Sequence, residues 1–268
     1  MVQGEPFRHP WTQRQVLLVG MGDSVTAGFG ASEKHSYFER LVANPADEFP
    51  EMHGICLSSV LPNLKFTNLA MSGSTSLDHV RKQLPKLVRA DSNTLGIIVL
   101  TTGGNDLIHN YGQTPPREGA MYGASLTQAE PWIHNFEERL ENLINGLQER
   151  FAGGCHIFLA NIYDPTDGLG DIERAGMPPW KEGGAVLNAY QQIIQRCAEK
   201  HFSVHLVNLH DQFLGHGLHC TQFWRKHYRR ADPHYWYYVN VEDPNDRGYD
   251  AIRRVFLIEL AKFSNQFR

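Results

Sequence analysis

Residues 15–28, QVLLVGMGDSVTAG, decide how this chain folds. The first part, Gln15–Gly20, is mostly apolar and rich in valine, which predicts a strand buried on both faces of a sheet. It runs straight into Gly22-Asp23-Ser24, which opens a helical pattern. A serine at the start of a helix lies beside free backbone N–H groups that stabilise negative charge. Two interpretations stay open: Ser24 is a nucleophile, or Asp23 and Ser24 only cap the helix.

Four more apolar runs follow, separated by helical patterns. Together the runs predict five strands: Gln15–Gly20, Lys65–Ala70, Leu95–Thr101, His156–Tyr163 and Val204–Leu209. Amphipathic spacing predicts helices at about Pro131–Phe151, Ala185–Ala198 and Arg247–Phe263, the last of them capped by Asp246. This alternation is typical of an α/β fold with a five-stranded parallel sheet between helices. Functional loops are then expected at the carboxyl ends of the strands.

The overall composition is that of an ordinary globular protein. The 268 residues are 41% hydrophobic and carry a net charge of −4, so we expect neither nucleic acid nor an anionic membrane as a partner. Basic residues between Arg225 and Arg230 form a local cluster, which we interpret as a solvated loop. No repeat or long linker divides the sequence, and a single domain is expected over residues 1–268.

The start of the chain and its cysteines bear on location. Residues 1–11 lack the apolar segment of a signal peptide, and no apolar run reaches the ~20 residues of a transmembrane helix. The expected location is therefore the cytoplasm. The cysteines are widely spaced and form no Cys-x-x-Cys pair, so we expect free thiols at Cys56, Cys155, Cys197 and Cys220.

Two further segments place glycine or amide groups at the ends of predicted strands. Asn68–Ser74 follows the second strand, and Thr102–Asp106 follows the third. An oxyanion hole needs fixed donors aimed at one point, and the Gly73 N–H and the Asn105 side chain are suitable donors. Taken singly, Gly73 fits a tight turn and Asn105 an Asx-turn or cap. Three such segments in this order favour a site around Ser24.

These segments resemble the ordered motif blocks of the GDSL/SGNH hydrolase superfamily. Gly22-Asp23-Ser24 is similar to its Gly-Asp-Ser block, Gly73 to the glycine of its second block, and Gly103–Asp106 to its Gly-x-Asn-Asp block. The resemblance implies a flavodoxin-like three-layer α/β/α sandwich and a serine ester hydrolase that needs no cofactor. It also implies that Ser24 attacks an ester carbonyl and forms an acyl-serine intermediate. The Ser24 N–H, the Gly73 N–H and the Asn105 side chain would then hold the oxyanion.

The fourth block departs from the superfamily pattern. The family usually carries Asp-x-x-His-Pro-Asn before the last helix, and this chain has Asn240-Val241-Glu242-Asp243-Pro244-Asn245. Aligned on Pro-Asn, Asp243 stands at the histidine position and Asn240 at the aspartate position. Both members of the usual base pair are therefore replaced. This favours a rival hypothesis, a catalytically silent domain that binds a carbohydrate or protein, whereas the intact Ser24 and Asn105 blocks favour the enzyme.

A replacement base is expected in the long connection between Asp211 and Asp246. Serine needs a base poised near neutral pH, and histidine is the natural choice. His216, flanked by glycines after the last strand, is our first candidate, with the Asp243 carboxylate orienting its ring. His234 beside Asp232 is the second candidate. His205 and His210 lie in or next to a strand and are interpreted as structural.

Metal sites and substrate are less well defined by the sequence. His216-x-x-His219-Cys220 lacks a fourth ligand at zinc spacing, and Asp164, Asp167 and Asp171 lack the spacing of a calcium loop. We therefore expect no metal. The expected substrate is a small carboxylic ester. An acetylated sugar is one candidate, since Trp224 and the aromatic run Tyr235–Tyr238 offer stacking surfaces.

Overall fold

A five-stranded parallel sheet forms the centre of the computed structural model, which describes residues 2–268. The strands are β1 (Gln15–Met21), β2 (Leu64–Asn68), β3 (Thr94–Leu100), β4 (Cys155–Ala160) and β5 (Val204–Val207). Their order in the sheet is β2-β1-β3-β4-β5, the flavodoxin-like order. The five predicted strands are confirmed, although β2, β4 and β5 end two or three residues earlier than predicted. Because all pairs are parallel, the carboxyl ends share one edge.

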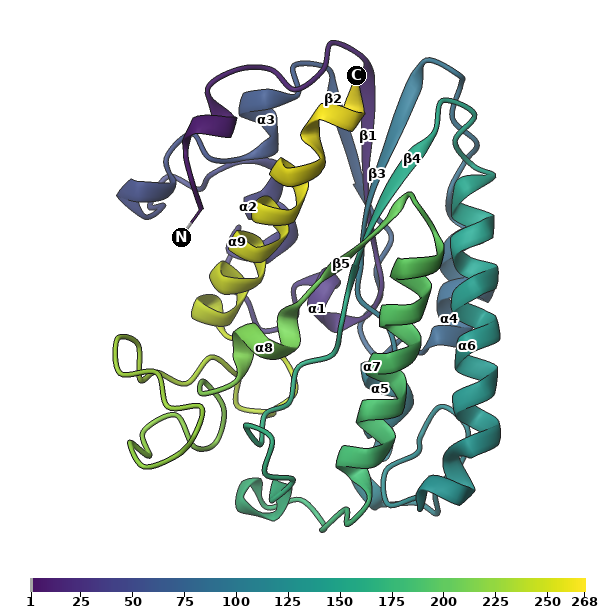
Figure 1. Cartoon of the computed structure of the whole chain (residues 1–268), viewed down its shortest axis with the longest axis vertical. Helices are drawn as coiled ribbons and strands as arrows, with labels where there is room; N and C mark the ends of the chain where they lie inside the picture. Colours follow the sequence, from purple (N-terminus) through teal and green to yellow (C-terminus); the bar gives the residue numbers. More distant parts are fainter. Residues whose placement is uncertain (1) are drawn as a thin grey trace.

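Helices cover both faces of the sheet, as Figure 1 shows. Helices α2 (Tyr37–Val42), α3 (Leu57–Val60) and α9 (Asp246–Phe263) lie on one face, and α4 (Ser76–Asp78), α6 (Leu126–Gln148) and α7 (Gly183–Lys200) lie on the other. Three short helices lie near the carboxyl edge: α1 (Ser24–Ala27), α5 (Gly104–Ile108) and α8 (Leu209–Phe213). Single turns complete the described chain: Glu5–Phe7, Pro50–Met52, His79–Gln83, Leu84–Lys86, His109–Gly112, Ile172–Ala175 and Ser264–Phe267. The predicted three-layer sandwich is confirmed.

The two cores follow from the alternation of side chains along each strand. In β1, Val16 and Leu18 pack into the core under α2 and α9, whereas Val19 and Met21 pack into the core under α6 and α7. All four of these side chains are buried. A strand buried on both faces needs apolar residues at successive positions, which is why the sequence reads as continuous runs.

The structure corrects two of the predicted helix starts. Helix α6 begins at Leu126 rather than near Pro131, because Ser125 and Gln128 form a reciprocal capping box one turn earlier. Helix α9 is capped by Asn245 rather than Asp246: the Asn245 side chain accepts hydrogen bonds from the N–H groups of Arg247 and Gly248. The Asp246 carboxylate instead accepts from the backbone and hydroxyl of Ser32.

The four cysteines are free, as predicted, and all four are buried. They pack as small apolar side chains, since no two of them form a disulfide. None of the helices within residues 2–268 is both long and apolar enough to span a membrane. The cytoplasmic location stays a prediction.

A buried cluster of charges joins α9 to α2 and to the segment that follows α2. The Arg253 guanidinium, 0% exposed, donates to both oxygens of Glu48 and also pairs with Asp250. Arg40 from α2 pairs with the same Glu48. These charges compensate one another in a place that water does not reach, so losing one partner leaves another buried and uncompensated.

We expect Arg253→Met to lower the free energy of unfolding by about 3–5 kcal/mol, the usual cost of breaking a buried ion pair. Urea unfolding monitored by circular dichroism measures this. Lys262→Met is the matched control on the same helix, because the ion pair of Lys262 with Glu259 is on the surface and should contribute less than about 1 kcal/mol. Equal losses in the two variants would contradict the role given to Arg253.

Candidate active site

Ser24 lies at the carboxyl edge of the sheet because the chain turns sharply after β1. Gly22 adopts φ +138°, and a Cβ atom there would lie 2.3 Å from the Thr101 carbonyl oxygen, so only glycine fits. The Gly22 N–H donates to the Gln83 side chain over 2.9 Å. The turn delivers Ser24 as the first residue of α1, where its partly exposed side chain lines a cavity.

Asp23 is a buried carboxyl group directly beneath this serine. It accepts hydrogen bonds from the Thr101 hydroxyl at 2.8 Å and from the Val25 N–H at 3.2 Å. The pKa of Asp23 is raised to about 6: burial is the main cause and the nearby Asp243 carboxyl adds to it, whereas the hydrogen bonds from Thr101 and Val25 oppose the shift. Asp23 therefore caps α1, as one of the two interpretations expected, and it carries a cost near neutral pH.

The structure brings the second and third sequence blocks together at the same edge. The Asn105 amide donates to the Ser74 carbonyl oxygen over 2.9 Å. The Asp106 carboxylate accepts from both the N–H and the hydroxyl of Ser76, at 2.8 and 2.6 Å. Gly73 stands at the turn before them with φ +78° and is exposed. The Gly73 turn and Asn105 are thus held in one hydrogen-bonded unit, although their role toward an oxyanion stays a prediction.

His109 also lies beside this unit, and it was not among the site residues predicted from the sequence. Its ring carbon Cε1 lies 3.9 Å from the point where a Cβ of Gly73 would stand. His109 follows Asn105 by one helical turn, in the single turn after α5. The spacing from Asn105 is the only feature that would have drawn attention to it.

Asp243, from the fourth block, faces Ser24. Its carboxyl group is buried, and burial raises its pKa, while the neighbouring Ser24 hydroxyl and the Asn240 amide lower it. The Asn240 amide donates to Oδ2 of Asp243 over 2.7 Å. The other oxygen, Oδ1, is buried and has no partner within 3.5 Å in residues 2–268. An acceptor with spare capacity thus lies next to the Ser24 hydroxyl.

The structure does not bring His216 to this carboxyl group. The His216 ring stacks on Trp236 with centroids 3.4 Å apart, and Nδ1 faces the His234 carbonyl oxygen at 3.1 Å. His234 itself pairs with Asp232 and is exposed. No histidine within residues 2–268 is among the residues that line the cavity beside Ser24. The glycine-flanked loop packs back on its own aromatic segment instead of crossing over the serine.

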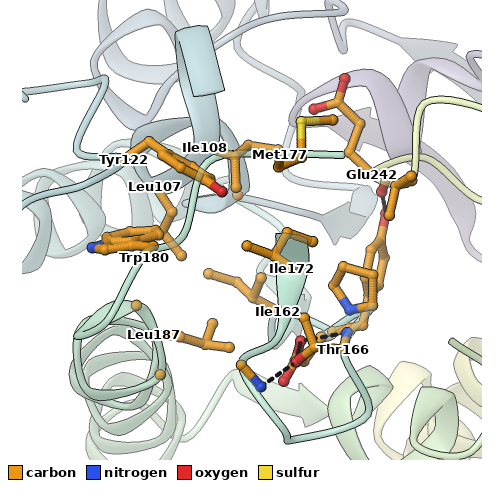
Figure 2. Close-up of a pocket in the computed structure, with 18 of the residues that line it drawn as sticks. Leu107, Ile108, Tyr122, Ile162, Thr166, Ile172, Met177, Trp180, Leu187 and Glu242 are labelled. Atoms are coloured by element: carbon orange, nitrogen blue, oxygen red, sulfur yellow. Dashed lines mark hydrogen bonds between the residues drawn. The ribbon is translucent and has the colours of Figure 1, made fainter. Parts of the chain in front are cut away.

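A cavity of about 610 Å³ opens beside Ser24 and Asn105. Figure 2 shows its walls, in which Ile162, Ile172 and Leu187 point inward and the rings of Tyr122 and Trp180 close one side. Much of the wall belongs to the connection between β4 and α7. The lining is mostly apolar, with Asn240 and Glu242 on the side of the fourth block. Such a cavity suits an apolar group held next to the serine.

Most of this chain matches a known protein family. The profile of the GDSL-like Lipase/Acylhydrolase family matches residues 21–251, which includes the four blocks just described. The chain belongs to this family. It is thereby a serine ester hydrolase, as the motif blocks predicted. No curated protein matches the sequence.

Solved structures of GDSL proteins share the fold at low sequence identity. An extracellular lipase from Streptomyces rimosus is 18% identical with a TM-score of 0.56, covering 92% of this chain and 99% of that one. A variant acetyl xylan esterase from Geobacillus stearothermophilus is 15% identical with a TM-score of 0.58, covering 93% and 96%. A G-D-S-L family protein from Veillonella parvula is 14% identical with a TM-score of 0.55, covering 90% of this chain and 96% of that one. These likenesses support the three-layer fold.

The candidate metal ligands of the sequence have other partners in this GDSL protein. The Asp167 carboxylate accepts from the backbone N–H groups of Gly215, Gly217 and His219, which ties the loop after β4 to the loop after α8. The His219 ring bonds to Asp171. Within residues 2–268, one other set has ligand atoms within 4.8 Å of one another, namely Glu141, Cys197 and His201 on α6, α7 and the residue after α7.

The raised pKa of Asp23 predicts a pH-dependent stability. The folded state binds this proton more tightly than the unfolded state, so the stability contributed by Asp23 falls as pH rises from about 4 to about 6. Well above pH 6, the ionised Asp23 carboxylate lowers the free energy of unfolding by about 3 kcal/mol. We expect Asp23→Asn to raise the melting temperature at pH 8 and to leave it nearly unchanged at pH 4.5. A stabilisation of equal size at both pH values would contradict this.

Proposed function

We propose that the chain hydrolyses carboxylic esters through an acyl intermediate on Ser24, with Asp243 as the base that accepts the serine proton. The observation that carries the proposal is the buried Asp243 carboxyl group facing the Ser24 hydroxyl. A general base must first lie within reach of the proton that it abstracts. Asp243 lies beside the Ser24 hydroxyl, whereas His216 bonds elsewhere. In this proposal Asp243 is the base itself and not a residue that orients histidine.

The reaction proceeds in two halves. As the Ser24 oxygen attacks the ester carbonyl, its proton passes to Asp243 and the carbonyl oxygen becomes an oxyanion. The N–H groups of Ser24 and Gly73 and the Asn105 amide stabilise that charge. Asp243 then protonates the departing alcohol, which leaves an acyl-Ser24 ester. Water then attacks this ester while Asp243 accepts its proton, and Asp243 returns that proton to the Ser24 oxygen as the acid product leaves.

The raised pKa of Asp243 suits this role. An ordinary aspartate is a weak base, and burial brings its proton affinity closer to that of a catalytic group at neutral pH. Asn240 holds the carboxyl group by its amide, 2.7 Å from Oδ2, and accepts the Asp243 N–H at 3.2 Å. The carboxylate therefore keeps one orientation without being neutralised by a cation.

The cavity supports an ester with an apolar group much larger than acetyl. Its volume of about 610 Å³ and its wall of Ile162, Ile172, Leu187 and other apolar side chains give space and apolar contacts to an acyl chain longer than acetyl. The structural neighbours include both a lipase and an acetyl xylan esterase, and these features favour a lipase-like substrate. We therefore propose acyl chains of medium length in place of the acetylated sugar expected from the sequence.

The base is tested by its substitutions. Asp243→Asn should lower kcat/KM for p-nitrophenyl octanoate by about 10² to 10⁴, the usual effect of a general base. The double variant Asn240→Asp/Asp243→His rebuilds Asp-x-x-His and should recover part of the activity. Its activity should fall on the acid side near pH 6.5, the ordinary histidine pKa. In the natural chain this fall should lie at lower pH, since protonated Asp243 cannot accept the serine proton.

His216→Asn is the matched control. It should retain most of the activity, because His216 bonds to a backbone carbonyl away from the cavity. Loss of activity in a folded His216→Asn protein, with Asp243→Asn retaining it, would overturn the assignment of the base. Ser24→Ala should abolish turnover and labelling by a fluorophosphonate. An unlabelled natural chain that turns over no ester would point to the silent binding domain.

The cavity predicts a chain-length preference. Activity should rise from p-nitrophenyl acetate to octanoate, and Leu187→Trp, which fills the cavity, should reduce octanoate hydrolysis at least about tenfold while sparing acetate. Leu126→Trp is the control, since Leu126 is exposed and lies outside the cavity lining. A natural chain that prefers acetate to octanoate would contradict an apolar substrate of medium length.

A further inference from the structure

The loop Thr221–Ala231 carries two large aromatic side chains on its surface. Phe223 is 73% exposed and Trp224 is 66% exposed, and their rings contact each other edge to face at 5.1 Å. Folded proteins seldom leave adjacent large apolar side chains in water unless a partner covers them. The loop belongs to the long segment between α8 and α9, which extends away from the body of the molecule in Figure 1.

The same loop is strongly basic. It holds Arg225, Lys226, Arg229 and Arg230, and no acidic residue occurs between Gln212 and Ala231, although the whole chain carries a net charge of −4. Lys226, Arg229 and Arg230 are exposed, and none of the four basic residues forms an ion pair within residues 2–268. Arg229 donates only to the backbone carbonyls of Leu214 and Asp211. The positive charge of the loop is thus available to a partner.

The loop is attached to the wall of the cavity beside Ser24. The Asp167 carboxylate accepts three N–H groups from the segment Gly215–His219, just before the loop. The His219 ring bonds to Asp171 at 2.8 Å, and the neighbours of Asp171, Gly170 and Ile172, line the cavity. Leu169 also lines the cavity and is itself 46% exposed. A surface bound by the loop would therefore meet the cavity wall.

We propose that the loop Thr221–Ala231, which we name the aromatic–basic loop, docks this hydrolase onto the surface of anionic lipid. Phe223 and Trp224 would enter the interface between headgroups and acyl chains, where tryptophan is favoured, and the basic side chains would contact anionic headgroups. The inference deepens the proposed function and rests on it: the apolar cavity would receive an acyl chain from that surface. The proposal reverses the expectation that an anionic membrane is not a partner. The sequence indicated only a solvated loop, because exposure of the two rings is a property of the fold.

Lipid fits the loop better than other polyanions. Nucleic acid binding needs a basic surface that follows several phosphates, whereas here the basic cluster is a single loop of a chain with a net charge of −4. An apolar cavity on the adjoining wall has a use at a lipid surface and none on a nucleic acid.

Vesicle sedimentation tests the docking apart from catalysis. The full chain carrying Ser24→Ala is mixed with vesicles of phosphatidylcholine alone or with about one third phosphatidylserine. We expect binding to the anionic vesicles that is at least about tenfold stronger and weakens with salt. Two double variants should each weaken binding to the anionic vesicles about tenfold or more: Phe223→Ser/Trp224→Ser and Lys226→Glu/Arg230→Glu. Phe202→Ser is the matched control, because Phe202 is 85% exposed but lies at the amino end of β5.

The outcomes separate this inference from the proposed function. Equal binding by the loop variants and the Phe202→Ser control would overturn the docking, as would binding to heparin or an acidic peptide with none to anionic vesicles. In the catalytically intact background, the loop variants should keep their activity on dissolved p-nitrophenyl octanoate and lose it on the same ester dispersed in anionic vesicles. Failure of the natural chain on the dissolved ester would refute the hydrolase proposal and leave the vesicle result standing.

Discussion

The close approach of β1 to β3 at their carboxyl ends is the constraint on which the site depends. Gly22 lies against the Thr101 backbone with no space for a side chain, and the Thr101 hydroxyl then bonds to Asp23. Gln83 closes the turn from the other side by bonding to both the N–H and the carbonyl of Gly22. Because the strands are parallel, this contact also brings the segments after β2 and β3 to Ser24.

The sequence predicted what depends on local pattern and on strand order. Continuous apolar runs identified the five strands, and strand-end glycines and amides identified the edge that holds Ser24, Gly73 and Asn105. The start of α6 was wrong because the capping box of Ser125 and Gln128 outweighs the helix-breaking tendency of Pro131. The start of α6 followed from bonds within a few residues.

The position of the histidines could not be predicted in the same way. Whether His216 turns toward Ser24 depends on the path of a loop of more than thirty residues, from Leu214 to Asn245. That path is set by contacts far apart in sequence: Asp167 with three N–H groups of the loop, and the His216 ring on Trp236. The cavity wall depends on the same contacts. Loop geometry of this kind leaves no period or spacing in the sequence.

Buried charges are paired with opposite charges under α9 but not at the site around Ser24. Under α9, Arg253 and Arg40 compensate Glu48, so each charge has an opposite partner. At the site, Asp23 and Asp243 are both buried, both have raised pKa values, and the groups that bond to them are neutral. Within residues 2–268, no cationic side chain bonds to either of these two carboxyl groups. A buried carboxylate without a cationic partner keeps a high affinity for a proton, as a general base must.

This chain has Asn240 and Asp243 where the family usually has Asp and His. Both pairs carry one negative charge, but here the carboxylate stands at the histidine position. In the usual pair a remote carboxylate accepts from a neutral histidine, and here a neutral Asn240 donates to a carboxylate that faces the serine. In the proposed mechanism, proton transfer therefore leaves neutral Asp243 next to the oxyanion, where the usual pair leaves an imidazolium cation. That cation would have helped to stabilise the oxyanion, so a larger share of the stabilisation falls on the Gly73 N–H and the Asn105 amide.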